Sequence, residues 1–364
     1  MQQILLKAWQ KKAVWLWLLL PLAALYRVVF FINKISYRWG IKKSYYSKVP
    51  VIVIGNITVG GSGKTPLIIA MVTYLQQKGI EVAVISRGYG GNETTMPCLV
   101  TAQSLPEQVG DEPCLIVQAT QVPLAVCPNR GQAIDLLLHQ YPKTQLILSD
   151  DGLQHFALDR DENWVVVDAD RGMGNQQVLP VGFLREPIHR LFEAHTTVIF
   201  HQADWQQPVM VDLKNSLSKE KDFTPLTLMR LVEQPLVPLF FSGNEPTTRL
   251  LPHQNATVTA LTGIGYPQRF FNSLSKLGFQ LIERPLDDHH AFSFADFTML
   301  PDLPIVVTAK DAVKLRILFA APQTPQQQAL AAKIWVLPVV AQLSAEVYQV
   351  LDRQVQQLLG SYKP

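Results

Sequence analysis

Cysteine is scarce in this chain of 364 residues, and the three that occur, Cys98, Cys114 and Cys127, form no C-x-x-C pair. An odd number of widely spaced cysteines does not support a disulfide framework, and the missing pairs do not support a structural zinc site. A reducing compartment fits this usage. Charged residues make up only 17% of the chain and apolar residues 48%, which excludes a disordered protein and indicates a globular one.

Acidic residues are absent from the first 48 residues, which carry nine lysines and arginines. The whole chain carries only +3, so the remainder is net acidic. A basic balance confined to one end does not predict nucleic-acid binding. Each lysine or arginine near an anionic leaflet contributes about 1 kcal/mol to membrane binding. We therefore interpret seven of these residues as contacts to lipid headgroups: Lys7, Lys11, Lys12, Lys34, Arg38, Lys42 and Lys43.

A long unbroken apolar run is also missing. Residues 13–26 are fourteen residues without a charge, and Arg27 separates them from the apolar residues 28–32. Fourteen helical residues reach about 21 Å, whereas the hydrocarbon core of a bilayer is ~30 Å thick. We therefore expect a helix that dips into one leaflet, because a true span would require Arg27 to snorkel. A cleaved signal peptide is excluded because no convincing small-x-small cleavage site follows.

Beyond residue 48, apolar strands alternate with helices. The pattern predicts strands at 49–54, 82–86, 146–149 and 164–167 and a helix at 66–78. A second strand-helix pattern has strands at 257–261, 280–284 and 305–307 and helices at 267–277 and 311–319. Strands that are apolar throughout, with helices between them, indicate a parallel sheet covered on both faces. No internal repeat or low-complexity tract interrupts this organisation.

The predicted fold class is therefore α/β, with three parts. A membrane-associated N-terminal helix and connector occupy residues 1–45. A domain like that of P-loop NTPases, built on a parallel sheet, occupies residues 46–225. A second, smaller α/β domain occupies residues 226–364, and its first residues, to about 240, form two extended segments that we interpret as a linker.

A glycine-rich turn follows the first predicted strand and ends in Lys64 and Thr65. The pattern G-x-x-x-x-G-K-[ST] is imperfect here because Thr58 occupies its first position. Backbone N–H groups of such a turn close around phosphates, the lysine reaches the β and γ oxygens, and the threonine holds Mg²⁺. Pro66 fits the first turn of the helix that follows. The predicted nucleotide-binding residues are Thr58, Gly60, Gly61, Ser62, Gly63, Lys64 and Thr65.

Two adjacent carboxylates, Asp150 and Asp151, directly follow the strand at 146–149. An acidic residue at the carboxyl end of a parallel strand is where a metal-organising group lies beside a phosphate loop. Asp-Asp-Gly is also good turn chemistry, so a structural β-turn is the competing interpretation. We favour function, with Asp150 as a second ligand of Mg²⁺ beside Thr65.

Four further charged motifs are ambiguous on their own. Asp111 lies in a Gly-Asp-Glu-Pro turn, His289 belongs to an Asp-Asp-His-His run, Arg185 and Glu186 stand between prolines, and Arg87 ends a strand. Each pattern suits a functional role, but taken alone it is more typical of a surface turn or of a residue that braces a loop.

Together these motifs resemble one family, the tetraacyldisaccharide 4′-kinases, which are the lipid A 4′-kinases of Gram-negative bacteria. The resemblance is carried by residues 55–66, 86–90, 110–113, 150–155, 179–187, 263–270, 288–289 and 308–311. Their order and spacing hold from about residue 14 to 316, and the apolar N-terminal helix fits as well. The chain departs from the family pattern at Phe183, where proline is usual, and at Leu153, where phenylalanine is common.

The resemblance implies ATP-dependent phosphorylation of the 4′-hydroxyl of a tetraacylated glucosamine disaccharide 1-phosphate, giving lipid IVA. By position, Asp111 and His289 would activate the hydroxyl, with Asp150 and Asp151 supporting catalysis. Arg87, Arg185 and Glu186 would serve phosphate, with Glu186 also a metal ligand. ATP and Mg²⁺ would be required, and the partners would be the lipid substrate and inner-membrane lipids at the cytoplasmic face, with no nucleic acid and no obligate protein partner.

Since Asp111 and His289 belong to different predicted domains, we predict that they meet only when the domains close on ATP. Two other classes of function remain open at this point. One is a P-loop NTPase of the cofactor-ligase or metal-insertion type, and the other is a non-catalytic nucleotide sensor anchored to a membrane.

Overall fold

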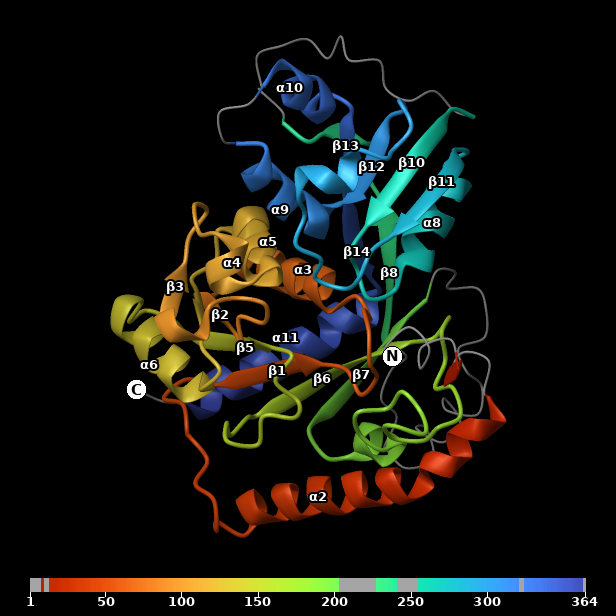
Figure 1. Ribbon diagram of the computed structural model, residues 1–364. Helices are drawn as coiled ribbons and strands as arrows, with labels where there is room; N and C mark the ends of the chain where they lie inside the picture. The colour runs from red at the N-terminus through yellow and green to blue at the C-terminus, as the bar shows by residue number, and fades with distance from the viewer. Residues whose placement is uncertain (1–7, 10–12, 203–226, 241–254, 321–323, 363–364) are drawn as a thin grey trace.

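The structure, a computed structural model, describes residues 8–9, 13–202, 227–240, 255–320 and 324–362 (Figure 1). Lys7, Lys11 and Lys12 lie outside the described residues. The first domain contains β1 (Val51–Gly55), β2 (Val82–Ser86), β3 (Cys98–Val100), β4 (Leu124–Val126), β5 (Leu146–Asp150), β6 (Glu162–Asp168), β7 (Thr196–His201), β8 (Thr227–Glu233) and β14 (Val339–Leu343). These strands form one nine-stranded sheet in the order β14-β8-β7-β6-β1-β5-β2-β4-β3.

Helices cover both faces of this sheet, as the apolar strands predict. The helices are α3 (Lys64–Gln77), α4 (Pro106–Val109), α5 (Asp111–Thr120), α6 (Arg130–Gln140) and α11 (Ala345–Ser361). Successive residues of β1 point to opposite faces, so Ile52 and Ile54 pack with α3, α5 and α11 while Val51 and Val53 pack with α6. All but the edge strands β3 and β14 run parallel, which places their carboxyl ends along one edge.

The second domain is a smaller sheet with its own core. Its strands are β9 (Val237–Pro238), β10 (Thr257–Thr262), β11 (Gln280–Pro285), β12 (Ile305–Thr308) and β13 (Ile334–Leu337), in the order β11-β10-β12-β13-β9. Its helices are α8 (Pro267–Lys276), α9 (Ala309–Leu318) and α10 (Pro325–Ala331). Separate apolar clusters lie on its two faces. This is the smaller α/β unit that the sequence pattern predicts.

The expected division at residue 226 needs correction. β8 is not a linker strand: it pairs in parallel with β7 and antiparallel with β14, both in the larger sheet. The last helix, α11, packs Val347 and Leu351 into the core of the first domain. The chain therefore crosses to the second domain after β8 and returns with β14. Pairing between strands this far apart in sequence depends on tertiary contacts, which local patterns do not record.

The N-terminal segment forms the 3-10 helix η1 (Val14–Leu19) and the α-helix α2 (Leu20–Arg38). Figure 1 shows α2 running along one side of the first domain. Val14–Arg38 is long and apolar enough to cross a membrane by length and composition. Only 11% of its most apolar window is buried within the protein. Leu16 and Ala23 pack into the core, whereas Val14, Leu18 and Leu25 are largely exposed.

Candidate active site

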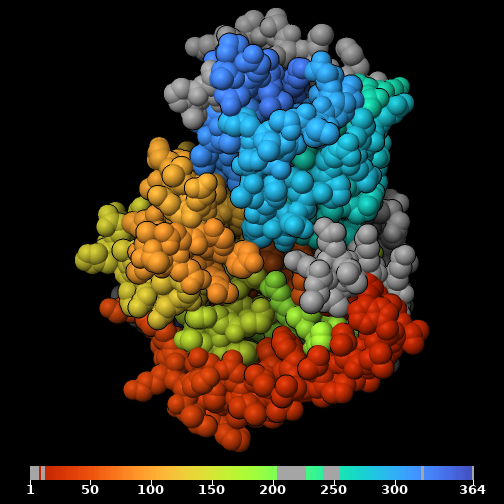
Figure 2. Space-filling model, viewed as in Figure 1, coloured from red at the N-terminus to blue at the C-terminus, as the bar shows by residue number. Residues whose placement is uncertain are grey.

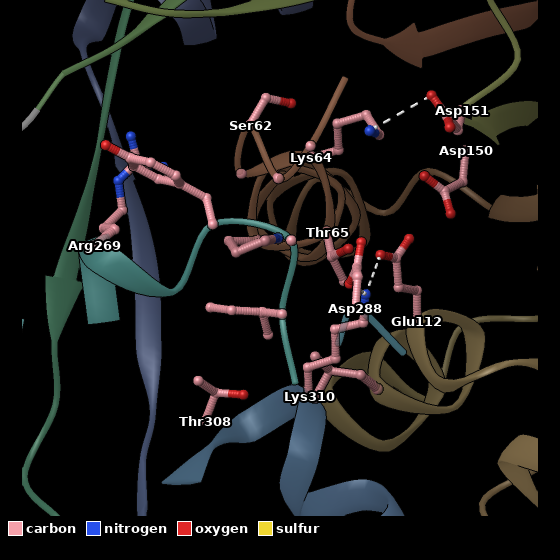
Figure 3. Close-up of a pocket in the computed structure, with 18 of the residues that line it drawn as sticks. Ser62, Lys64, Thr65, Glu112, Asp150, Asp151, Arg269, Asp288, Thr308 and Lys310 are labelled. Carbon is pink, nitrogen blue, oxygen red and sulfur yellow. Dashed lines mark hydrogen bonds and ion pairs between the residues drawn. The ribbon is translucent and has the colours of Figure 1, made fainter. Parts of the chain in front are cut away.

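A cleft of about 1190 Å³ lies where the two domains meet. Figure 2 shows the second domain resting against the α4–α5 side of the first, and Figure 3 shows residues from both domains inside the cleft. From the first domain it is lined by the phosphate loop and by residues that follow β2 and β5. Ligands of α/β sheets bind at the carboxyl ends of strands, so the topology itself places the cleft here.

The phosphate loop is shaped by local backbone conformation. Gly63 has φ +91°, and a Cβ there would lie 2.9 Å from the Nδ1 atom of His201. This turn starts α3 at Lys64, so the helix presents its N-terminus to the cleft. The Lys64 Nζ atom lies 3.2 Å from Asn56 Oδ1 and 3.5 Å from Asp151 Oδ1 (Figure 3). The predicted loop residues from Gly60 to Thr65 all line the cleft.

Asp150 and Asp151 are adjacent, but their pKa values are shifted in opposite directions. Burial, then the nearby charges of Glu112 and Asp151, raises the pKa of Asp150 to about 7. Burial acts in the same direction on Asp151, but Lys64 and Arg185 outweigh it and lower its pKa to about 2. Asp151 is therefore ionised at neutral pH, while the charged form of Asp150 is disfavoured mainly by its burial.

Asp111 and His289 are in contact across the two domains. The His289 Nδ1 atom lies 3.1 and 3.0 Å from the two carboxylate oxygens of Asp111. Asp111 is buried and does not line the cleft, whereas His289 does. The pair that was expected on family resemblance is thus brought together, and its dependence on ATP stays a prediction.

Two lysines of α9 hold this pair. Lys314 Nζ lies 3.0 Å from Asp111 Oδ2 and donates to the backbone oxygen of His290. Lys310 Nζ lies 3.3 Å from His289 Nε2 and 2.9 Å from Glu112 Oε1. Burial alone would raise the pKa of Asp111, but the hydrogen bond with His289 and the charges of Lys310 and Lys314 lower it well below its ordinary value.

Of the other predicted residues, Arg87 lines the cleft, whereas Thr58 and Glu186 lie behind its lining. Thr58 is buried and does not line the cleft; its Oγ1 accepts from Asn56 Nδ2 at 3.3 Å. Arg87 lines the cleft and lies 3.6 Å from Glu93. Glu186 is fully buried outside the lining, between Arg190 at 3.3 Å and Gln154. Glu186 therefore supports the site from behind, and we withdraw the expectation that it binds metal.

Sequence reasoning missed three residues. His201 lies at the end of β7 and holds the Ser62 backbone oxygen at 2.8 Å. Arg130 is buried in the cleft wall and donates to the backbone oxygens of Cys127 and Asp150. Arg269 of α8 pairs with Asp168 at 2.7 Å, joining the domains. Asp168 directly follows the predicted strand at 164–167, and this position was the signal that could have found the pair it makes with Arg269. The strand that ends at His201 was not predicted, so no comparable signal in the sequence pointed to that residue.

Comparison with known proteins settles the family. Residues 15–356 match the family model described as tetraacyldisaccharide-1-P 4′-kinase. The chain belongs to this family. It is similar to the tetraacyldisaccharide 4′-kinase of Psychrobacter cryohalolentis, at 49% identity over 98% of this chain and 97% of the relative. The enzyme of that name from Actinobacillus pleuropneumoniae serotype 7 is 42% identical over 97% of this chain and 99% of its own length.

A solved structure supports the fold. The "apo" form of LpxK from Aquifex aeolicus, in complex with ATP, has a TM-score of 0.66 and 24% identity, covering 94% of this chain and 98% of that one. The fold class predicted from the sequence is confirmed. Family membership makes the chain a kinase of lipid A biosynthesis and does not support the alternative of a cofactor-ligase or metal-insertion NTPase.

Proposed function

We propose that the chain transfers the γ-phosphate of ATP to the 4′-hydroxyl of a tetraacylated glucosamine disaccharide 1-phosphate, forming lipid IVA. The observation that carries this proposal is the Asp111–His289 pair beside the phosphate loop, since a sugar hydroxyl is a poor nucleophile and needs a base. The loop and Asp111 belong to the first domain and His289 belongs to the second, and the loop and His289 line the same cleft.

His289 is the base in this proposal. An ionised carboxylate only accepts hydrogen bonds, so Asp111 accepts from Nδ1–H of His289 and leaves the lone pair on Nε2. Nε2 then takes the proton of the hydroxyl as the O–P bond forms and the bond to ADP breaks. Asp111, whose pKa is held low, stays ionised and stabilises the imidazolium. Lys310, close to Nε2, must move aside to admit the hydroxyl.

Phosphate charge is met by the loop and its neighbours. Lys64 and the α3 N-terminus stabilise the γ-phosphate, and Arg87 and Arg185, which also line the cleft, serve phosphate. Asp151 holds both Lys64 and Arg185, at 3.5 and 3.0 Å, so it fixes the spacing of two cations. Catalysis here is positioning and charge compensation rather than covalent chemistry by the protein.

The donor set fits Mg²⁺. Asp150 Oδ1 is buried without a hydrogen-bond partner among the described residues, and burial, then the nearby charges of Glu112 and Asp151, raises the pKa of this carboxyl. Described residues contain no cluster of three His, Cys, Asp or Glu side chains that could hold a metal alone, which suits an ion bound mainly through phosphates. Thr65 and Asp150 would hold Mg²⁺, which neutralises phosphate charge when bound.

The reaction is proposed to occur at the cytoplasmic face of the inner membrane. α2 lies lengthwise along the kinase body (Figure 1), and Val14, Leu18, Leu25 and Val29 are largely exposed. A helix held along the protein in this way suits one leaflet better than a span. Inner-membrane lipids and the acylated acceptor are thus the proposed partners.

A transfer assay tests the function. Purified full-length protein, ³²P-labelled ATP with Mg²⁺ and the tetraacylated disaccharide 1-phosphate in detergent should give a labelled lipid that chromatography identifies. His289→Gln and Asp111→Asn should each lower kcat at least about 100-fold, which is the range of a lost general base. Release of the label only as inorganic phosphate, or full activity in both variants, would refute the proposal.

A further inference from the structure

The N-terminal helix contacts the supports of the active site directly. The hydroxyl of Tyr26, on α2, donates to the backbone oxygen of Arg185 at 2.6 Å. Arg27, the next residue, donates to Gln177 Oε1 at 2.8 Å in the loop that precedes this segment. Phe30 packs edge-on against Phe156. One face of α2 therefore sits on the loops that carry phosphate-site residues.

A short path leads from Tyr26 to the phosphate loop. Arg185 Nη1 lies 3.0 Å from Asp151 Oδ2, and Asp151 Oδ1 lies 3.5 Å from Lys64 Nζ. Arg185, Asp151 and Lys64 all line the cleft, whereas Tyr26 does not. Three contacts thus separate an aromatic hydroxyl on the membrane-facing helix from the lysine that meets the γ-phosphate.

A second path from the same helix ends at the same lysine. It runs through contacts in the order Lys34, Glu193, Arg190, Glu186, Gln154, Asn56 and Lys64. Arg190 and Glu186 are almost completely buried, so this path is well shielded from solvent. Two sets of contacts, which pass through the neighbouring residues Arg185 and Glu186, converge on Lys64. They are more than an anchor requires, since a membrane anchor needs only an exposed apolar face.

We propose that Tyr26 is a positioning residue for phosphoryl transfer: its hydroxyl holds the Arg185 peptide, and through Arg185 and Asp151 it sets the place of Lys64. The inference rests on the proposed roles of these three residues. A guanidinium and an ammonium that share one carboxylate lose their alignment when the backbone beneath one of them shifts. Phosphoryl transfer depends on such alignment, so a small displacement lowers the rate.

The test is Tyr26→Phe in the full-length enzyme, which removes one oxygen and keeps the ring. We expect kcat to fall about five- to tenfold, the effect of one lost hydrogen bond to a part-buried acceptor, with unchanged recovery in the membrane fraction. Tyr37→Phe is the matched control, because Tyr37 lies on the same helix and packs on Phe156 without a hydroxyl contact to the site. Its kcat should stay within about twofold of the parent.

A double-mutant cycle separates positioning from simple stabilisation. If Tyr26 acts through Arg185, then Tyr26→Phe added to Arg185→Gln changes kcat by less than about twofold. Multiplicative effects, or a fall in kcat that tracks loss of folded protein by circular dichroism, would overturn the proposal, as would an unchanged kcat in Tyr26→Phe. An inactive parent enzyme would instead defeat the proposed function, so the two failures are distinguishable.

Discussion

The ionisation of Asp111 depends on both its burial and the charges around it. Asp111 is almost fully buried, which by itself opposes ionisation, yet His289, Lys310 and Lys314 surround it. The hydrogen bond with His289 and the charges of the two lysines keep it ionised, so it accepts from His289 rather than taking a proton itself. In the sequence, Asp111 stands in an ordinary Gly-Asp-Glu-Pro turn, and nothing local predicts these three partners, all of which come from the other domain.

Lys64→Ala should abolish transfer, because it removes the ammonium that compensates γ-phosphate charge. We expect less than a tenth of the parent kcat at saturating ATP, measured by the lipid-labelling assay. Lys48→Ala is the control, because Lys48 precedes β1 and does not line the cleft, and this change should leave kcat unchanged. Activity of Lys64→Ala above a tenth would count against the role of the loop.

His201 predicts a pH effect on stability. Burial, then the charge of Arg269, lowers the pKa of His201 to about 4, so the folded state disfavours its protonation. The unfolded state binds the proton from about pH 6.5 downward, so the stability contributed by neutral His201 is present above about pH 6.5 and is lost progressively toward pH 4.

His201→Asn removes the titration but keeps a donor for the Ser62 backbone oxygen. The stability of the parent relative to this variant should fall by about 2 kcal/mol between pH 7.5 and pH 5.0. Urea unfolding at the two pH values measures it. A difference that grows on acidification would show that the sign of the pKa shift is wrong.

At the scale of elements, η1 and α2 combine two roles on opposite faces. One face packs Leu16 and Ala23 against the first domain and places Tyr26 on Arg185. The other exposes Val14, Leu18 and further apolar side chains. The apolar run and its basic flanks predict a membrane-associated helix, but only the structure reveals which side is docked on the kinase body.

Deleting residues 1–35 should release the enzyme from membranes while leaving transfer to detergent-dispersed substrate partly intact. The deletion removes the exposed apolar side chains of η1 and α2, which should abolish membrane binding. It also removes the hydrogen bond from Tyr26 to the Arg185 backbone, so we expect kcat to fall about tenfold without vanishing. Flotation on a density gradient measures membrane binding, and the labelling assay measures kcat. Continued flotation with vesicles would contradict the role of this segment.

At the scale of the whole molecule, polar contacts tie the second domain to the first around the cleft. Arg269 on α8 pairs with Asp168 at the end of β6, and Lys314 on α9 pairs with Asp111 on α5. Asp168 is 3% exposed, so its ion pair with Arg269 is largely shielded from water. The geometry of the active site is therefore also the geometry of the domain interface.

Arg269→Gln should loosen the second domain, because it removes the ion-pair partner that joins the buried Asp168 to α8, at a cost of roughly 3 kcal/mol. We expect faster amide hydrogen exchange in Pro267–Lys276 and a lower kcat, with exchange in β1 and β5 unchanged. Arg353→Gln, at an exposed site on α11, is the control. Equal exchange in both variants would indicate that the ion pair does not hold the interface.

The local sequence by itself determined several structural elements of this protein. The run of apolar strands determined a covered parallel sheet, the glycine turn before Lys64 determined a phosphate loop, and the apolar start determined a long apolar helix. Each depends on residues that are neighbours in the chain. Three-dimensional packing alone decided that β8, β14 and α11 belong to the first domain, that Glu186 sits behind the site, and that Asp111 meets His289. These depend on contacts between distant segments, whose free energy comes from burial and charge pairing that appear only when the chain is folded.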